Sequence, residues 1–322
     1  MSGKKIGIIF GGEYTRIIST TDGMIYDDLS LVCWNDLTTE VVVMGKDAKK
    51  MIDRVDKPLR VIAPLENETI QNLEVFKSMV EQLLNKFKNE VKDAEVVISA
   101  PTIHTEQVQQ IMDELLAPYG MEEIHYVPKL ILAALGGNIK TDDEYGSILL
   151  DLGHYKAEVA VIADDELITI TSSDIAEREL DKKIVLYLKE EYSLLIEEDT
   201  LEKIKWSLGS VIKLRDELEL QLPGRDMITN ARKTVVVKDG DFKKIFIQLF
   251  TTYKGMITTA LEQSPMYIRT GIVKNGLTIT GELSGIIGVK DFFQDFFDFP
   301  TRTSKARGYA TTEGVIKYFN KL

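Results

Sequence analysis

SILLDLGHYKAEVAVI (Ser147–Ile162) and KIGIIFGGEYTRIIST (Lys5–Thr20) are the two stretches that decide the fold. Each reads as an apolar strand, a tight turn and a second strand. Superposing the two turns sets Asp151 opposite Ile9. A strand that ends in Asp-x-Gly can aim backbone N–H groups at a phosphate, and its carboxylate can hold the water shell of Mg²⁺. The pair therefore predicts a nucleotide-binding fold in which only the second hairpin keeps its acid.

Composition indicates a soluble protein of one bilobed domain or two domains, with 322 residues of which 44% are hydrophobic. Its 51 acidic and 39 basic residues give a net charge of -12, which opposes sequence-independent binding to nucleic acid and does not favour binding to anionic lipid. A single cysteine, Cys33, excludes an internal disulfide and fits a reducing compartment. Because no signal peptide and no run near the ~20 apolar residues of a membrane span is found, a cytoplasmic location is expected.

Strands and helices alternate along the chain, which predicts an α/β sheet covered by helices. The polar stretch Gly137–Gly146 is the expected lobe boundary, and after it the pattern restarts with the second hairpin. This restart suggests two related halves produced by an internal duplication. The run FFQDFFDFP at Phe292–Pro300 is expected to place most of its rings in the core, with a subunit contact as the alternative for some of them.

Several collinear segments then resemble one family. YLKEEYSLLIEEDTLEKIKWSLGS, LPGRDMITNARKTVVV, GLTITGELSGIIGVKDFF and AEVVISAPTIHTEQVQQIMDEL match in order and spacing the bacterial actins of the MreB type, within the actin, Hsp70 and sugar-kinase superfamily. The resemblance implies an α/β actin-like fold, a duplicated ribonuclease H-like arrangement of two lobes around a central nucleotide cleft. Lobe I is expected at residues 1–140 plus 300–322, and lobe II at 141–299. Collinear matches of this kind are more specific than a lone glycine motif.

The same resemblance implies ATP and Mg²⁺ as cofactors and carries the family's contact positions onto this chain. The residues expected at the nucleotide are Gly11, Gly12, Glu13, Tyr14 and Thr15 of the first hairpin, Gly153, His154, Tyr155 and Lys156 of the second, and Glu179, Glu202, Lys205, Thr280, Gly281, Glu282 and Gly285, with Asp151 at the metal. Alternatives stay open for several of them. Asp151 can cap a turn, Lys156 can be solvated, and Glu202 with Lys205 can be an ordinary i,i+3 ion pair.

The chemistry departs from the family pattern at the catalytic positions. Ile9 stands for the first acidic residue and cannot order a metal-bound water. Lys129 stands for the catalytic Glu, and a protonated lysine has no lone pair with which to accept a proton from the attacking water. No catalytic residue is therefore assigned. The sequence predicts at most a weak ATPase, and it leaves open whether ATP binds at all.

The expected function is that of an actin-like cytoskeletal or scaffold protein that forms filaments, with weak or lost ATP hydrolysis. The alternative is a non-polymerising pseudo-ATPase that acts as an adaptor or assembly factor. The first partner implied is a second copy of the chain, because family protomers stack head to tail. A membrane-protein or cytoskeletal partner is a further candidate, whereas direct membrane binding is not expected because the segment FKNEVKDAE is charged.

Overall fold

The structure is a computed structural model that describes residues 3–66, 69–100 and 105–322. Contacts between residues divide the chain into two compact units. Unit 1 comprises Met1–Gly136 and Tyr309–Leu322, and unit 2 comprises Gly137–Gly308. The sequence assigned residues 300–322 to the first lobe, whereas strand β18 (Thr301–Thr303) pairs with a strand of unit 2 and so lies there.

Unit 1 is built on a five-stranded sheet in the order β10-β9-β1-β2-β3. The first three strands along the chain form an antiparallel meander, β9 pairs in parallel with β1, and β10 pairs in parallel with β9. A smaller sheet, β5-β4-β6, and a two-stranded ribbon complete the unit. The strands are β1 (Lys4–Phe10), β2 (Tyr14–Ser19), β3 (Gly23–Leu29), β4 (Val32–Asn35), β5 (Glu40–Met44), β6 (Leu59–Ile62), β7 (Leu65–Glu66), β8 (Thr69–Ile70), β9 (Ala94–Ser99) and β10 (Glu123–Tyr126).

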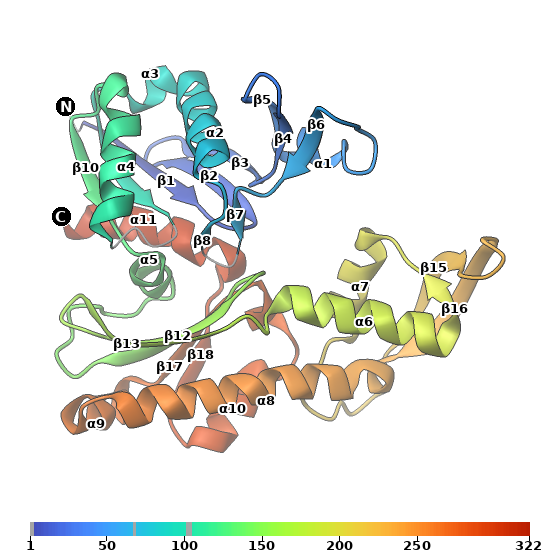
Figure 1. Ribbon diagram of the computed structural model, residues 1–322. Helices are drawn as coiled ribbons and strands as arrows, with labels where there is room; N and C mark the ends of the chain where they lie inside the picture. The colour runs from blue at the N-terminus through green and yellow to red at the C-terminus, as the bar shows by residue number, and fades with distance from the viewer. Residues whose placement is uncertain (1–2, 67–68, 101–104) are drawn as a thin grey trace. The chain divides into compact units, whose positions relative to one another are not determined.

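The helices of unit 1 cover both faces of this sheet (Figure 1). They are α1 (Gly45–Lys49), α2 (Leu73–Lys86), α3 (Lys88–Val91), α4 (Glu106–Leu116), α5 (Lys129–Gly136) and α11 (Ala310–Lys321). Side chains of a strand alternate between faces, so Ile6, Ile8 and Phe10 pack with α2 and α4. Gly7 points to the other face, where Val315 of α11 lies against it. Local capping starts α2, since the Asn72 side chain accepts from the Val75 N–H at 3.0 Å.

Unit 2 repeats the sheet of unit 1, in the order β13-β12-β11-β17-β18. Again three antiparallel strands form a meander, a fourth strand pairs in parallel with the first strand of the meander, and a fifth pairs in parallel with the fourth. The common topology agrees with the duplication inferred from the two hairpins. The strands are β11 (Ser147–Leu152), β12 (Ala157–Ala163), β13 (Glu166–Ser173), β14 (Leu194–Leu195), β15 (Glu219–Asp226), β16 (Arg232–Lys238), β17 (Leu277–Gly281) and β18.

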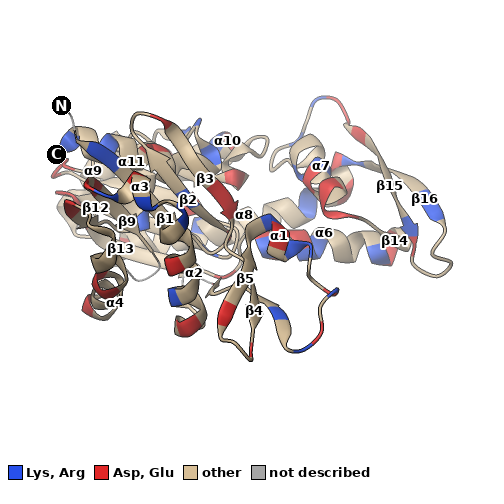
Figure 2. Ribbon diagram, turned by 90° about the horizontal axis from the view of Figure 1, so that it is seen from above, with Lys and Arg blue, Asp and Glu red and all other residues tan. Residues whose placement is uncertain are grey.

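The helices of unit 2 are α6 (Glu177–Tyr192), α7 (Glu198–Leu208), α8 (Asp239–Gln263), α9 (Met266–Asn275) and α10 (Val289–Phe297). Figure 1 shows the long α8 running beneath β12 and β13, where its aromatic residues join Leu150 and Val159 in the core. Lys and Arg lie beside Asp and Glu around α6 and α7 of this unit, as they do along α2 of unit 1 (Figure 2). Within the described ranges, no helix is long and apolar enough to cross a membrane.

The phenylalanine run Phe292–Pro300 forms the end of α10 and its exit. Phe293 and Phe299 are buried, and Phe292 and Phe297 pack partly against the same core. The expectation that most rings are internal therefore holds, and Phe296, at 57% exposure, is the exception. The Lys254 ammonium lies 3.6 Å from the ring centre of Phe292 and 4.4 Å from that of Phe296, a cation–π contact that covers both rings.

Helices α5 and α11 approach each other so closely that only glycine fits at two positions. A Cβ on Gly136 would lie 1.8 Å from the Ala310 carbonyl oxygen, and one on Gly314 would lie 1.8 Å from that of Leu132. The Lys317 ammonium also donates to the carbonyls of Leu135 and Gly136, which end α5. Since α5 precedes unit 2 in the chain and α11 follows it, this contact returns the chain to unit 1.

We expect Gly314→Ala to lower the free energy of unfolding by about 3 kcal/mol, because a backbone oxygen cannot move aside for the new methyl group. The matched control is Gly255→Ala in α8, where nothing lies within 4 Å of the added Cβ and alanine favours a helix by about 0.5 to 1 kcal/mol. Urea unfolding followed by circular dichroism measures both. Equal effects of the same sign would show that the glycine contact is not required.

Candidate functional site

The turn of the first hairpin is closed by contacts within unit 1. The Gly11 N–H donates to the Tyr14 carbonyl at 3.0 Å, and the Ser30 hydroxyl donates to the Gly11 carbonyl at 2.6 Å. The Thr15 hydroxyl lies 2.9 Å from that of Ser30 and is buried. Gly12 is buried as well, and Glu13 accepts at its carbonyl from the Ser30 N–H. Of the predicted phosphate-contacting groups, the Thr15 hydroxyl is thus committed to the protein itself.

Tyr14 belongs to a cluster with Arg16, Asp27 and Tyr309. The Arg16 Nε donates to Asp27 Oδ1 at 2.9 Å, and its guanidinium lies 5.0 Å from the Tyr14 ring centre and 4.5 Å from that of Tyr309. The Tyr309 hydroxyl donates to the other oxygen of Asp27 at 3.0 Å. Burial, together with the negative charges of Glu13 and Asp27, raises the pKa of Tyr14 to about 12. The tyrosine therefore packs as a neutral ring against an arginine that already has its counterion.

The two residues that the resemblance places at catalytic positions, Ile9 and Lys129, both lie in unit 1. Ile9 is 5% exposed and pairs in register with Arg16 across the hairpin, as a core residue does. Lys129 is the first residue of α5, directly after Pro128, and is half-buried. Neither side chain offers an oxygen to a metal ion or to an attacking water.

The second hairpin keeps its acid in a buried position of unit 2. Asp151 is the penultimate residue of β11 and is 5% exposed, and its Oδ1 accepts from the Thr280 hydroxyl at 2.7 Å. Asp151 and Thr280 face each other in the parallel pair β11–β17, so the predicted metal residue and the predicted turn residue are brought together. The turn is closed by the Gly153 N–H, which donates to the Lys156 carbonyl at 3.1 Å.

In the first turn of α6, N–H groups that have no acceptor within the helix donate to this hairpin. The Arg178 N–H donates to the His154 carbonyl at 2.9 Å, and the Glu177 N–H donates to the Gly153 carbonyl at 3.5 Å. A helix N-terminus is a common place for a phosphate because its N–H groups lack partners in the helix. Here protein carbonyls take two of them. The Arg178 guanidinium also lies 5.3 Å from the Tyr155 ring centre, and the Tyr155 ring packs edge-on against His154.

Lys205 is the centre of a buried ionic cluster between α6 and α7. Its ammonium lies 2.6 Å from a Glu177 oxygen, 3.1 Å from Asp181 and 2.5 Å from Glu202, and its side chain is 1% exposed. His154 stands 3.8 Å from the second Glu177 oxygen. The i,i+3 ion pair weighed as the alternative for Glu202 and Lys205 is thus present, with two more carboxylates on the same ammonium.

The cluster shifts the pKa of each member in a direction that follows from burial and charge. Burial disfavours every charged form, but Glu177 and Asp181 outweigh it for Lys205, whose pKa is raised. His154 and Lys205 likewise lower the pKa of Glu177 despite its burial. Asp181 differs, because burial and the charge of Glu177 raise its pKa to about 6 in spite of Lys205. One ammonium cannot neutralise three carboxylates, and the raised pKa of Asp181 reflects this imbalance.

The late turn of unit 2 follows β17. Gly281 has a φ of +83°, and a Cβ on it would lie 2.0 Å from the Leu152 carbonyl oxygen, so this position requires glycine. Gly285 lies beneath the Arg307 guanidinium, whose centre is 5.6 Å from the Trp206 ring centre. The Glu282 carboxylate lies close to Gly308. A polar pocket of about 460 Å³ adjoins the turn and is lined by Ser284, Gly285, Ile286, Gly288, Val289, Lys290, Asp291, Thr303, Ser304, Lys305 and Arg307.

Sequence reasoning did not assign Glu177, Asp181, Trp206 and Arg307 to the site. Glu177 and Asp181 are four residues apart on one face of α6, a spacing that could have suggested a shared partner. The Trp206 indole donates to Glu202 at 2.9 Å, which holds that carboxylate beside Lys205. Glu179, which was assigned, instead pairs with Lys182 at 3.6 Å toward the surface. No pattern in the sequence indicates that Arg307 contacts Trp206, because the contact depends on the path of the chain after β18.

The raised pKa of Asp181 predicts a stability that falls as pH rises. Between its ordinary value of 3.8 and about 6, the folded state holds a proton that the unfolded state has released, so ionisation costs folding free energy. We expect Asp181→Asn to raise the free energy of unfolding by roughly 2 kcal/mol at pH 7.5 and by about half of that at pH 5. Urea titration at both pH values measures this. Glu190→Gln, an exposed change on the same helix, is the control, and a gain independent of pH would contradict the assignment.

Comparison with known proteins agrees with this architecture. The model of the MreB/Mbl protein family matches residues 3–322. The cell shape-determining protein Mbl of Bacillus subtilis (strain 168) is 26% identical over 283 residues, which cover 87% of this chain and 85% of that protein. The crystal structure of MreB 5 of Spiroplasma citri bound to AMPPNP superposes with a TM-score of 0.84 at 24% identity, covering 100% of this chain and 97% of that one.

A MamK double helical filament also matches, with a TM-score of 0.73 at 15% identity over 99% of both chains. The predicted α/β actin-like fold is therefore confirmed. The match of the family model across the chain shows that this protein belongs to the MreB/Mbl family of actin-like proteins.

Proposed function

We propose that this protein is a filament-forming cytoskeletal protein of the MreB/Mbl family in which ATP hydrolysis is weak or lost. The proposal that ATP hydrolysis is weak or lost is supported first by the cluster of charged residues around Lys205. Lys205 is the position that the family resemblance assigns to the nucleotide, yet its ammonium is 1% exposed and holds three carboxylates of its own chain. A ligand would have to displace these ion pairs, at the cost of leaving buried charge unpaired.

Glu177 is the residue that most distinguishes the site from a nucleotide-binding one. The family resemblance has a glycine there, and this chain places a carboxylate at 5% exposure within hydrogen-bonding distance of Lys205. Its negative charge also opposes the approach of a triphosphate. With Ile9 and Lys129 at the catalytic positions, the chain lacks the groups that would order a metal-bound water and accept its proton.

Assembly rests on a different argument. Self-association in the family is a repeated head-to-tail contact, which propagates without closing. The MamK chain whose fold this protein shares is known as a double helical filament, and the curated relatives are named for determining cell shape. A chain that keeps the fold over its full length while its nucleotide contacts are replaced is expected to assemble without depending on ATP.

Sedimentation and negative-stain electron microscopy with and without ATP and Mg²⁺ test the assembly. We expect filaments in both conditions. A monomer that persists at high concentration would instead support the alternative, a non-polymerising pseudo-ATPase adaptor. Measurable ATP turnover that Asp151→Ala abolishes would contradict the proposed loss of hydrolysis.

Calorimetric titration with ATP and Mg²⁺ tests the role of Glu177. We expect Glu177→Gly to raise the affinity for ATP by at least about tenfold, because it frees one contact to a charged group worth roughly 1.5 to 3 kcal/mol. Glu177→Gln keeps the volume of the side chain but not its charge, so its affinity for ATP should lie between that of the unaltered protein and that of Glu177→Gly. Glu190→Gln on the same helix should change nothing. Tight ATP binding by the unaltered protein, unchanged in Glu177→Gly, would show that the carboxylate does not obstruct the site.

A further inference from the structure

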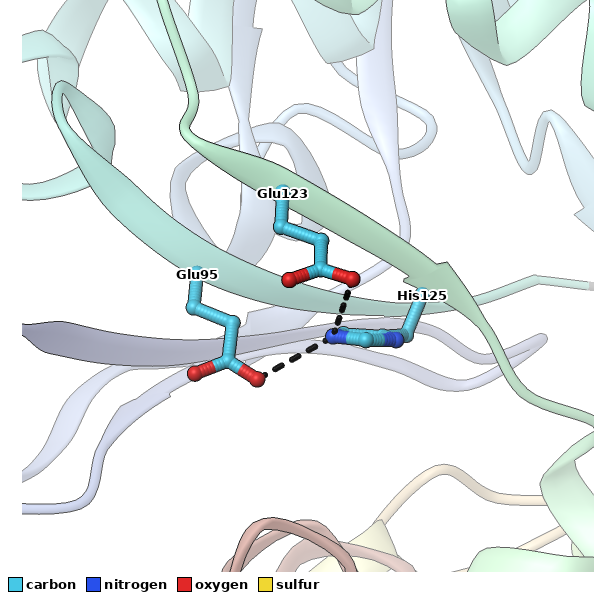
Figure 3. Close-up of side chains that lie close together, drawn as sticks. All are labelled: Glu95, Glu123 and His125. Atoms are coloured by element: carbon cyan, nitrogen blue, oxygen red, sulfur yellow. Dashed lines mark hydrogen bonds and ion pairs between the residues drawn. The ribbon is translucent and has the colours of Figure 1, made fainter. Parts of the chain in front are cut away.

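We propose that Glu95, Glu123 and His125 form a binding site for a divalent transition-metal ion on the sheet of unit 1, apart from the nucleotide positions. Figure 3 shows the two carboxylates converging on one nitrogen of the imidazole. The His125 Nε2 lies 3.1 Å from a Glu95 oxygen and 3.8 Å from a Glu123 oxygen. Every pair of these three ligand atoms lies within 4.8 Å.

Strand register brings the three side chains together. Glu95 and Glu123 are direct partners in the parallel pair β9–β10, and His125 follows Glu123 by two residues, so all three share one face. Like charges on directly opposed residues of neighbouring strands destabilise a sheet unless a cation lies between them. The arrangement therefore has a cost that a bound cation would remove.

The local charge balance leaves room for such an ion. Lys5 is the partner of Glu95 on β1, and its ammonium lies 3.5 Å from the Glu95 oxygen that faces away from His125. The same ammonium donates to the Phe319 carbonyl near the end of α11, at 3.3 Å. Two carboxylates and one ammonium leave a net negative charge among these three groups, and the helix end adds partial negative charge.

The separations fit a tetrahedral ion with N and O ligands. Bonds of about 2.0 to 2.2 Å at the tetrahedral angle place ligand atoms about 3.3 Å apart, close to the 3.1 and 3.8 Å observed. His125 and Glu95 are held by packing at 17% and 22% exposure, whereas Glu123 is 64% exposed and leaves the fourth position open to water. Tyr318 packs edge-on against the imidazole and fixes its plane. An imidazole nitrogen in the set favours Zn²⁺ over Mg²⁺ or Ca²⁺.

A second His–carboxylate group serves as an internal comparison. His154, Glu177 and Asp181 also lie within 4.8 Å of one another. There, however, the Lys205 ammonium sits 2.6 Å from Glu177 and 3.1 Å from Asp181, so a cation of the chain itself already occupies the position of the metal. At Glu95 the Lys5 ammonium lies 3.5 Å from Oε2 whereas His125 faces Oε1, so the lysine and the imidazole approach different oxygens of this carboxylate.

Zinc chloride added to the full-length protein tests the proposal by calorimetry. We expect one equivalent of Zn²⁺ to bind, with the affinity reduced at least about tenfold in Glu95→Gln and in His125→Phe, which keeps the ring packed on Tyr318. Glu122→Gln, an adjacent exposed acid, and His154→Ala, in the second cluster, should bind as the unaltered protein does. Equal binding by His125→Phe would overturn the site, because the zinc would then be held elsewhere.

Two further measurements distinguish a specific metal site from misfolding of the variants and from non-specific binding of zinc to acidic residues. Without metal, the melting temperature of the variants should be no lower than that of the unaltered protein, because Glu95→Gln removes the repulsion between the two carboxylates. A hundredfold excess of Zn²⁺ over its Kd should raise the melting temperature of the unaltered protein alone, by about 5 °C. The chain has three histidines, so imidazole nitrogen NMR resolves them individually. Zinc must shift the signal that is lost in His125→Phe, and a shift of another histidine alone would refute the proposal.

Discussion

The backbone contact between α5 and α11 is the constraint on which the two-unit organisation depends. Gly136 and Gly314 let each helix rest directly on a carbonyl of the other, a distance that no side chain would allow. Through this contact the chain leaves unit 1 at the end of α5 and regains it at the start of α11. In the sequence, unit 2 is therefore inserted between two helices of unit 1 whose backbones are in direct contact. Each unit has a sheet and a hydrophobic core of its own.

Buried charge determines what the candidate site can do. In unit 2 a lysine at 1% exposure is surrounded by carboxylates from α6 and α7, and the helix N-terminus beside it donates to hairpin carbonyls. In unit 1 the matching hairpin is closed by Ser30 and Thr15, and its tyrosine stacks on an arginine. Groups that the family resemblance assigns to a ligand make contacts within the protein, and this common pattern supports weak or lost nucleotide chemistry.

The fold could be predicted because its signals are local. Alternating apolar residues marked β1, β2, β11 and β12, and the matching hairpins indicated a duplication that the two sheets display. Other segments lack such signals. Strand β3 is Asp-containing and only half-buried, β18 has three residues, and α9 carries exposed Met266, Tyr267 and Val273 instead of a continuous apolar stripe. Their structure is set by neighbours to which they pair or pack, and one sequence does not reveal those neighbours.

By itself the sequence determined the fold class and the two hairpins, and Ile9 and Lys129 led to the prediction that catalytic groups are lost, because residue type at a motif position decides what chemistry is possible. Only the tertiary structure decided which charges meet. Glu177, Asp181 and Glu202 reach Lys205, and Glu95, Glu123 and His125 gather on one face, through helix packing and strand register. Electrostatic energy depends on separation and burial, and both are properties of the folded chain.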